Sequence, residues 1–214
     1  ESNEILKKSF YGVEKKSLPY LLCTTNMLLH DVNEPNIIRG NSLEKNVRDY
    51  EEEDKFDIIL MNPPYGGTEK KSVQQNFPTD LRDSETADLF MVEILYRLKQ
   101  NGKVGIVLPD GFLFGNDNTK VAIKKKLMEE CNLHTIIRLP GSIFAPYTSI
   151  ATNLLFFDKT GPTQETWFYR MDLPEGYKAF SKTKPVELKH LQSIIDWWYN
   201  RTEIKDLKDD ESLT

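Results

Sequence analysis

Residues 56–65 read Phe-Asp-Ile-Ile-Leu-Met-Asn-Pro-Pro-Tyr, and they set the architecture that we expect for the whole chain. The apolar run Phe56–Met61 predicts a strand buried on both faces of a sheet. Two successive prolines have no N–H to donate, so the strand must stop at the tetrad Asn62-Pro63-Pro64-Tyr65. The tetrad therefore lies at the carboxyl end of a buried strand, which is where open α/β sheets place their ligand sites.

Outward from this strand, short β-branched or aromatic runs alternate with helical patterns, which predicts a mainly parallel sheet with crossover helices. The expected strands cover residues 9–14, 36–39, 56–61, 103–108, 133–139, 152–158 and 165–171. The expected helices cover 1–8, 18–28, 87–100, 118–130 and 187–199, with a loop over 68–86. The connection between strands 133–139 and 152–158 is short for a helical crossover, so we expect these two to be antiparallel.

Composition narrows the class of protein. Hydrophobic residues make up 39% of the 214 residues and charged residues 29%, which is typical of a globular chain. No apolar run is long enough to span a membrane, and no signal peptide is evident. Cys23 and Cys131 have no metal-ligand spacing and the three histidines are scattered, so we expect reduced thiols, no metal site and a cytoplasmic protein.

The tetrad suggests a particular chemistry. Asn62 offers a side-chain carbonyl, Pro63 a backbone carbonyl on a stiff segment, and Tyr65 a flat ring. Together they can stack a planar group and accept two hydrogen bonds from an –NH₂. An aromatic amine is a poor nucleophile, and two acceptors at roughly 3 Å would aim its lone pair at a methyl donor without a strong base. The alternative is a rigid turn in which Tyr65 serves only as packing.

The order of several motifs carries a resemblance to a known family. The motifs are Phe10-Tyr11-Gly12-Val13-Glu14, Asn26-Met27-Leu28-Leu29-His30, Ala87-Asp88-Leu89-Phe90, residues 107–115 and Thr152-Asn153-Leu154-Leu155-Phe156-Phe157. Together with Asn62-Pro63-Pro64-Tyr65 and Leu108-Pro109-Asp110-Gly111, they are similar to the modification (M) subunit of type I restriction–modification enzymes, which are N6-adenine DNA methyltransferases. The resemblance implies methyl transfer from S-adenosyl-L-methionine to the exocyclic amine of a flipped adenine, catalysed by Asn62, Pro63, Pro64 and Tyr65.

The resemblance also implies roles in cofactor binding. Glu14 matches the acidic residue that binds the cofactor ribose, although a solvated carboxylate at a strand end is the simpler interpretation. Asn41, with Ser42 beside it, matches the residue that contacts the cofactor adenine, although Asn and Ser equally close a turn. Asn62 is expected beside the cofactor as well.

Three other residues have weaker expectations. Phe144 or Tyr147 could supply a second aromatic contact to the target base, although an aromatic residue in a loop more often caps a core. Asp110 is expected to brace the end of its strand.

The chain departs from the family at one point. None of its glycines forms a Gly-x-Gly cluster after a strand. We therefore expect a Rossmann-like α/β methyltransferase sheet that lacks its first strand and glycine-rich loop, and no bound cofactor. The strands that begin at Ser9 and Phe56 should flank a gap or pair directly. Residues 1–159 would be a partial catalytic domain cut from a longer protein, and 160–214 a strand and helix extension with a frayed end over 205–214.

Several alternatives stay open. A protein-glutamine or RNA amine methyltransferase uses the same tetrad, and an inactive scaffold fragment would need no chemistry. The resemblance implies DNA, a DNA-specificity subunit and a restriction subunit as partners. The net charge of −5 indicates that DNA affinity comes largely from another subunit. A contact through the helix 187–199, with Trp197 and Trp198, is conceivable, but its apolar stripe is expected to pack on its own domain. The DNA sequence recognised cannot be deduced.

Overall fold

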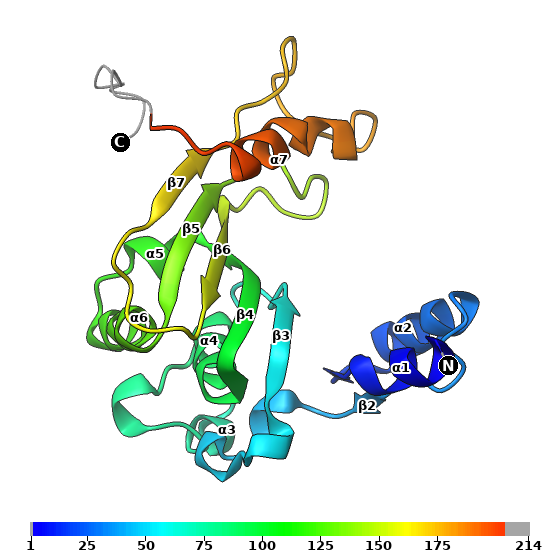
Figure 1. Cartoon of the computed structure of the whole chain (residues 1–214), viewed down its shortest axis with the longest axis vertical. Helices are drawn as coiled ribbons and strands as arrows, with labels where there is room; N and C mark the ends of the chain where they lie inside the picture. The colour runs from blue at the N-terminus through cyan, green and yellow to red at the C-terminus, as the bar shows by residue number, and fades with distance from the viewer. Residues whose placement is uncertain (1, 204–214) are drawn as a thin grey trace.

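The computed structural model describes residues 2–203 and divides the strands between two sheets (Figure 1). A small sheet pairs β1 (Gly12–Glu14) with β2 (Ile37–Arg39) in parallel. The large sheet has the order β3-β4-β6-β5-β7. Its strands are β3 (Phe56–Met61), β4 (Leu98–Pro109), β5 (Asn132–Arg138), β6 (Thr152–Asp158) and β7 (Trp167–Arg170).

Seven α-helices and five 3₁₀ turns occur in the described part of the chain. The helices are α1 (Ser2–Ser9), α2 (Ser17–Leu29), α3 (Lys71–Gln74), α4 (Thr86–Arg97), α5 (Asp110–Phe114), α6 (Asn118–Glu130) and α7 (Gln192–Tyr199). The 3₁₀ turns cover Ser42–Glu44, Val47–Asp49, Glu52–Asp54, Thr79–Leu81 and Leu188–Leu191. The helix expected over 187–199 thus begins as a 3₁₀ turn.

The large sheet is mixed, where a mainly parallel sheet was expected. β3 pairs with β4 and β5 with β7 in parallel, while β6 is antiparallel to both of its neighbours. The antiparallel pairing of β5 with β6 confirms the prediction from their short connection, because a parallel pair would need a longer crossover.

The larger of two buried hydrophobic clusters lies on one face of the large sheet, and the smaller one lies toward α7 on the other. Alternate residues of β4 and β6, such as Leu108 and Leu155, face helices α4 and α6 and are fully buried. Residues of opposite parity face α7, where the Trp198 ring lies 4.9 Å from the Phe156 ring. The helix of Trp197 and Trp198 therefore packs on its own sheet, as the simpler interpretation predicted.

β3 is an edge strand, and the expectation that it is buried on both faces is wrong. Ile58 is 67% and Leu60 78% exposed, whereas Ile59 and Met61 pack against the core. The strand pairs only with β4, and β1 lies in the other sheet. β1 and β3 are therefore not paired with each other, so of the two expectations for these strands, direct pairing is wrong.

Several element boundaries differ from the sequence predictions: β5 lies one residue earlier, β7 is shorter, and the expected loop 68–86 contains α3 and a 3₁₀ turn. Ser9 ends α1 and the following strand is only Gly12–Glu14, because Ser9 closes the helix through a hydrogen bond from its hydroxyl to the Ile5 carbonyl. α4 ends at Arg97 rather than at residue 100, because the buried Leu98 pairs with Phe56 and starts β4 early. α5 follows directly after β4 where only a turn was expected. Residues 205–214, expected to fray, lie outside the described residues.

Candidate functional site

The tetrad lies where β3 ends, at the carboxyl edge of the parallel pair β3–β4. Pro63 is buried, Tyr65 is half-buried, and Asn62 and Pro64 are exposed. The Tyr65 hydroxyl donates a hydrogen bond to Asn62 Oδ1, and burial raises the pKa of Tyr65. The side-chain acceptor and the flat ring are therefore adjacent, and a planar amine would have to replace the tyrosine hydroxyl at Asn62.

The loop after the tetrad is anchored on the first turn of α4. Gly66 has a φ of +69°, a conformation that glycine adopts without strain and that reverses the chain here. The Thr86 N–H donates to the Gly67 carbonyl at 2.9 Å, and Thr68 bridges to Glu85. A Cβ on Gly67 would lie 2.9 Å from the Thr86 hydroxyl oxygen, so the loop and the helix meet too closely for a side chain. The start of α4 therefore holds the tetrad in place.

An apolar groove of about 400 Å³ runs beside Asn62 along the exposed face of the large sheet. It is lined by Leu60, Met61, Asn62, Gly105, Ile106, Val107, Leu154 and Phe156. Asn62 is the polar side chain at the end of an otherwise apolar surface.

The two aromatic candidates for a second base contact differ in position. The Phe144 ring lies 6.5 Å from the Tyr65 ring, tilted by 53°. Tyr147 is 92% exposed. The structure therefore brings Phe144 to the tetrad.

Asp110 braces the strand ends, as predicted. Its carboxylate accepts two hydrogen bonds from Arg138 at 3.1 and 2.8 Å and one from Asn153 at 2.7 Å. Because Arg138 ends β5 and Asn153 lies near the start of β6, one carboxylate ties three adjacent strands together at the edge that carries the tetrad. A bidentate arginine–carboxylate pair is well suited to this, since its geometry is fixed.

The expected cofactor residues lie on the small sheet. Glu14 ends β1, and its carboxylate accepts from the Lys16 N–H at 2.7 Å. Asn41 follows β2 and caps the next 3₁₀ turn, with its side chain accepting from the Leu43 N–H at 3.3 Å. Asn41 therefore closes a turn, as one of its two interpretations predicted. The side-chain NH₂ group of Asn41 takes no part in that cap.

Asn41 and Ser42 also line a cavity of about 390 Å³, whose lining includes both polar and apolar side chains. Val13 and Gly40 contribute to its wall, but Glu14 does not. The rest of the lining includes the rings of Tyr11 and Tyr50 and the charged side chains of Glu44, Lys45, Asp54 and Arg97. Aromatic rings beside amide and hydroxyl groups fit the adenosine half of S-adenosyl-L-methionine. The sequence has no glycine-rich loop that could enclose the sulfonium and carboxylate of the cofactor.

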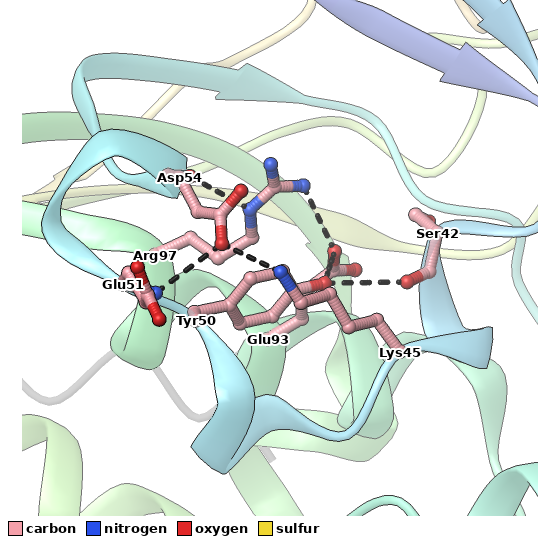
Figure 2. A network of polar contacts seen from close by, with 7 residues as sticks. All are labelled: Ser42, Lys45, Tyr50, Glu51, Asp54, Glu93 and Arg97. Carbon is pink, nitrogen blue, oxygen red and sulfur yellow. Dashed lines mark hydrogen bonds and ion pairs between the residues drawn. The ribbon is translucent and has the colours of Figure 1, made fainter.

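A network of polar side chains contacts the turn that begins at Asn41 and Ser42 (Figure 2). It was not predicted from the sequence. The Tyr50 hydroxyl donates to Glu93 Oε1 at 3.0 Å and lies 3.4 Å from the Ser42 carbonyl. Arg97 donates to the same Glu93 oxygen at 3.3 Å. No signal in the sequence joins these residues, because Tyr50 and Glu93 are 43 positions apart and Glu93 looks like any polar residue of a helix.

An ion pair joins the residue after β1 to the loop that follows the tetrad. Lys15, directly after Glu14, lies 2.9 Å from Glu69, whose side chain is only 9% exposed. The carboxyl ends of β1 and β3 are therefore connected through side chains, although the strands do not pair.

The basic cluster Lys124-Lys125-Lys126 is engaged within the chain. Lys124 donates to the Leu113 carbonyl in α5 and to the Gly115 carbonyl just after it, and Lys125 and Lys126 pair with Glu129 and Glu130 one turn along α6. The cluster is therefore an ordinary helix face. Within residues 2–203, no cluster of three or more His, Cys, Asp or Glu side chains could hold a metal, and no helix is long and apolar enough to cross a membrane.

Both cysteines are free thiols. Cys23 is exposed, and Cys131 is buried, which raises the pKa of its thiol to about 11. The buried thiol therefore stays protonated at neutral pH.

Comparison with known proteins gives close relatives. The chain is 50% identical over 204 residues to the methylase subunit of the type I restriction enzyme EcoEI from Escherichia coli, covering 95% of this chain and 41% of that protein. It is 32% identical over 200 residues to the EcoKI methylase subunit from Escherichia coli K12, covering 87% and 36%. The crystal structure of a modification subunit of a putative type I restriction enzyme from Vibrio vulnificus YJ016 matches with a TM-score of 0.90 and 44% identity, covering 95% of this chain and 44% of that chain.

The chain thus spans about two-fifths of the length of these relatives. The model of the N-6 DNA Methylase family matches residues 1–212, which include the small sheet and the tetrad. Because nearly all of the sequence matches, and because half of the positions compared are identical in the EcoEI subunit, the chain belongs to the N-6 DNA methylase family.

Proposed function

We propose that these residues are part of the catalytic domain of a subunit that methylates the exocyclic N6 amine of adenine in DNA. The observation that carries the proposal is that the Asn62 Oδ1 acceptor and the half-buried side chain of Tyr65, whose hydroxyl donates to it, lie side by side at the end of β3. S-adenosyl-L-methionine, when bound, supplies an electrophilic methyl group on its sulfonium.

The chemistry follows from the acceptors. Asn62 Oδ1 and the Pro63 carbonyl accept the two amine hydrogens and favour a pyramidal nitrogen, whose lone pair then forms the new N–C bond. With the cofactor bound, the methyl carbon–sulfur bond would break as the N–C bond forms, the sulfur would leave as a neutral thioether, and the displaced amine proton would pass to water. The Tyr65 ring stacks on the extruded base, and Phe144, 6.5 Å from Tyr65, is the better candidate than Tyr147 for a second aromatic contact.

The cofactor residues would act from the other sheet. Glu14 would bind the ribose hydroxyls, and Asn41 and Ser42 the adenine ring. Asn62 lies at the junction between the cofactor methyl and the target amine. These roles are proposals that rest on the position of the three residues at the carboxyl ends of β1 and β2.

The partners are also a proposal. With a net charge of −5 and its lysine cluster paired internally, the chain should bind DNA weakly and depend on a specificity subunit, within an assembly that includes a restriction subunit. A gel shift at physiological salt tests this. A tight shift by the isolated chain would contradict it, and a shift that needs the specificity subunit supports it.

The experiment on substrate uses methyl-labelled cofactor and the full-length protein with its specificity subunit. DNA, RNA and protein are offered in parallel, and the labelled product is digested to single nucleosides or amino acids. Label in N6-methyladenine from DNA is expected. Label in glutamine or in RNA would replace the proposal by an amine methyltransferase of another class, and absence of label from all three would indicate a scaffold.

A further inference from the structure

The proposed site is divided between two sheets that share no backbone ladder. Asn41 and Ser42 follow β2 in the small sheet, whereas Asn62 follows β3 in the large one. Methyl transfer requires reacting atoms about 3–3.5 Å apart, so the relative position of the two sheets must be held closely. Side chains contribute to that restraint, together with the backbone hydrogen bond from the Val47 N–H to the Asn76 carbonyl at 3.1 Å.

Arg97, at the end of α4, occupies the junction of the two sheets. Its guanidinium lies 4.6 Å from the centres of the Tyr50 and Phe56 rings and 5.3 Å from that of Tyr11. Its Nε donates to the Asp54 carbonyl at 3.2 Å, and its side chain is only 11% exposed. A planar cation among three rings joins the residues before β1 and β3 to α4.

The same cluster reaches the cofactor turn through Tyr50 (Figure 2). The Tyr50 hydroxyl donates to Glu93 Oε1 at 3.0 Å, with the Ser42 carbonyl as a second acceptor at 3.4 Å. The Glu93 side chain is 3% exposed, and Arg97 is its ionic partner. Burial and the Glu93 charge raise the pKa of Tyr50, so its hydroxyl remains a donor at neutral pH.

We propose that Tyr50, Glu93 and Arg97 are positioning residues that hold the Asn41–Ser42 turn at a set distance from β3. Tyr50 and Arg97 also line the cavity assigned to the adenosine half, and none of the three residues takes part in bond formation. This rests on the proposed function, because it assigns the adenosine half of S-adenosyl-L-methionine to that turn. It adds a specific restraint between the cofactor half and the amine half of the site.

The test compares Tyr50→Phe with Tyr96→Phe in the full-length protein. Each change removes one hydroxyl. Tyr96 lies on α4 beside Lys126 of α6, away from the small sheet, and is the matched control. Calorimetry with S-adenosyl-L-methionine and with S-adenosylhomocysteine measures binding, and labelled methyl transfer to DNA at saturating substrates measures kcat. The melting temperature is recorded for each variant.

Tyr50→Phe should raise both dissociation constants about tenfold, which corresponds to about 1.4 kcal/mol. Its kcat should stay within about twofold of wild type, and Tyr96→Phe should bind like wild type. A dissociation constant for Tyr50→Phe within twofold of wild type overturns the proposal, whatever happens to the melting temperature, because that is the outcome of a purely structural role.

Three further outcomes bear on the proposal. If Tyr50→Phe does not fold, Glu93→Gln replaces it: it keeps an acceptor for Tyr50 and removes the charge opposite Arg97, and a weakening below twofold again overturns the proposal. If the wild-type protein binds cofactor but labels RNA or protein rather than DNA, the substrate assignment fails while the positioning role is still measured. If the wild-type protein does not bind the cofactor, both proposals fail together.

Discussion

At the scale of single residues, the tetrad was predictable because its chemistry is local. Asn62, Pro63 and Tyr65 are neighbours in sequence, and their position after an apolar strand is confirmed. What the sequence could not reveal is that the Tyr65 hydroxyl already occupies the Asn62 acceptor. Such a contact depends on the side-chain and backbone conformation of the tetrad, and no pattern of residue types encodes it.

This contact leads to a prediction for two variants of Tyr65. Tyr65→Phe should keep methylation within about threefold of wild type, because the ring still stacks and Asn62 Oδ1 becomes free for the amine. Tyr65→Ala should weaken the hold on the extruded base by about 1–3 kcal/mol, the usual worth of a base–aromatic stack. Steady-state kinetics on DNA would show this as a rise in KM. A Phe variant as impaired as the Ala variant would assign the role to the hydroxyl instead.

At the scale of elements, strongly periodic segments were predicted well. β3, β6 and α6 have the expected bounds, because their apolar patterns end at clear polar or proline stops. The boundary between α4 and β4 was missed because Leu98 continues the apolar pattern of the helix while its backbone pairs with Phe56. The exposure of Leu60 was missed as well, since a run of apolar residues does not reveal which strands lie beside it.

The start of α4 is fixed by a buried ion pair. Asp88 is completely buried and lies 2.9 Å from the ammonium of Lys120 on α6, whose side chain is 8% exposed. Desolvation raises the pKa of Asp88 to about 6 even though Lys120 opposes the shift. The native state therefore holds this proton more tightly than the unfolded chain does. The stabilisation from protonating Asp88 is fully present below about pH 4 and is lost as pH rises through about 6.

Lys120→Met should destabilise the protein by about 3–5 kcal/mol at pH 7.5, because it leaves the buried carboxylate unpaired. The loss should shrink at pH 5.5, where Asp88 takes up a proton. Urea unfolding at both values measures it. Lys125→Met is the control, since Lys125 is 70% exposed and its loss should change stability by no more than about 0.5 kcal/mol. An equal loss for Lys120→Met at both pH values would show that Asp88 does not titrate in this range.

At the scale of the whole molecule, the two-sheet arrangement predicts weak cofactor binding by these 214 residues alone. Glu14, Asn41 and Ser42 offer contacts to the adenosine half, but a glycine-rich loop for the methionine half is not in this sequence. Each missing hydrogen bond is worth about 1 kcal/mol, and each 1.4 kcal/mol is a factor of ten. Calorimetry should give a dissociation constant of about 100 μM or weaker. A low-micromolar value would mean that the loop is dispensable.

Asn62→Ala in the full-length protein tests whether Asn62 and Pro63 hold an amine for methyl transfer. Methylation of DNA by the variant is measured with labelled cofactor, and calorimetry measures cofactor binding in parallel. We expect kcat to fall by at least about a hundredfold, because one preorganised hydrogen-bonding group at the reacting centre is lost. The cofactor dissociation constant should stay within about threefold of wild type. Methylation at the wild-type rate would contradict the role assigned to Asn62.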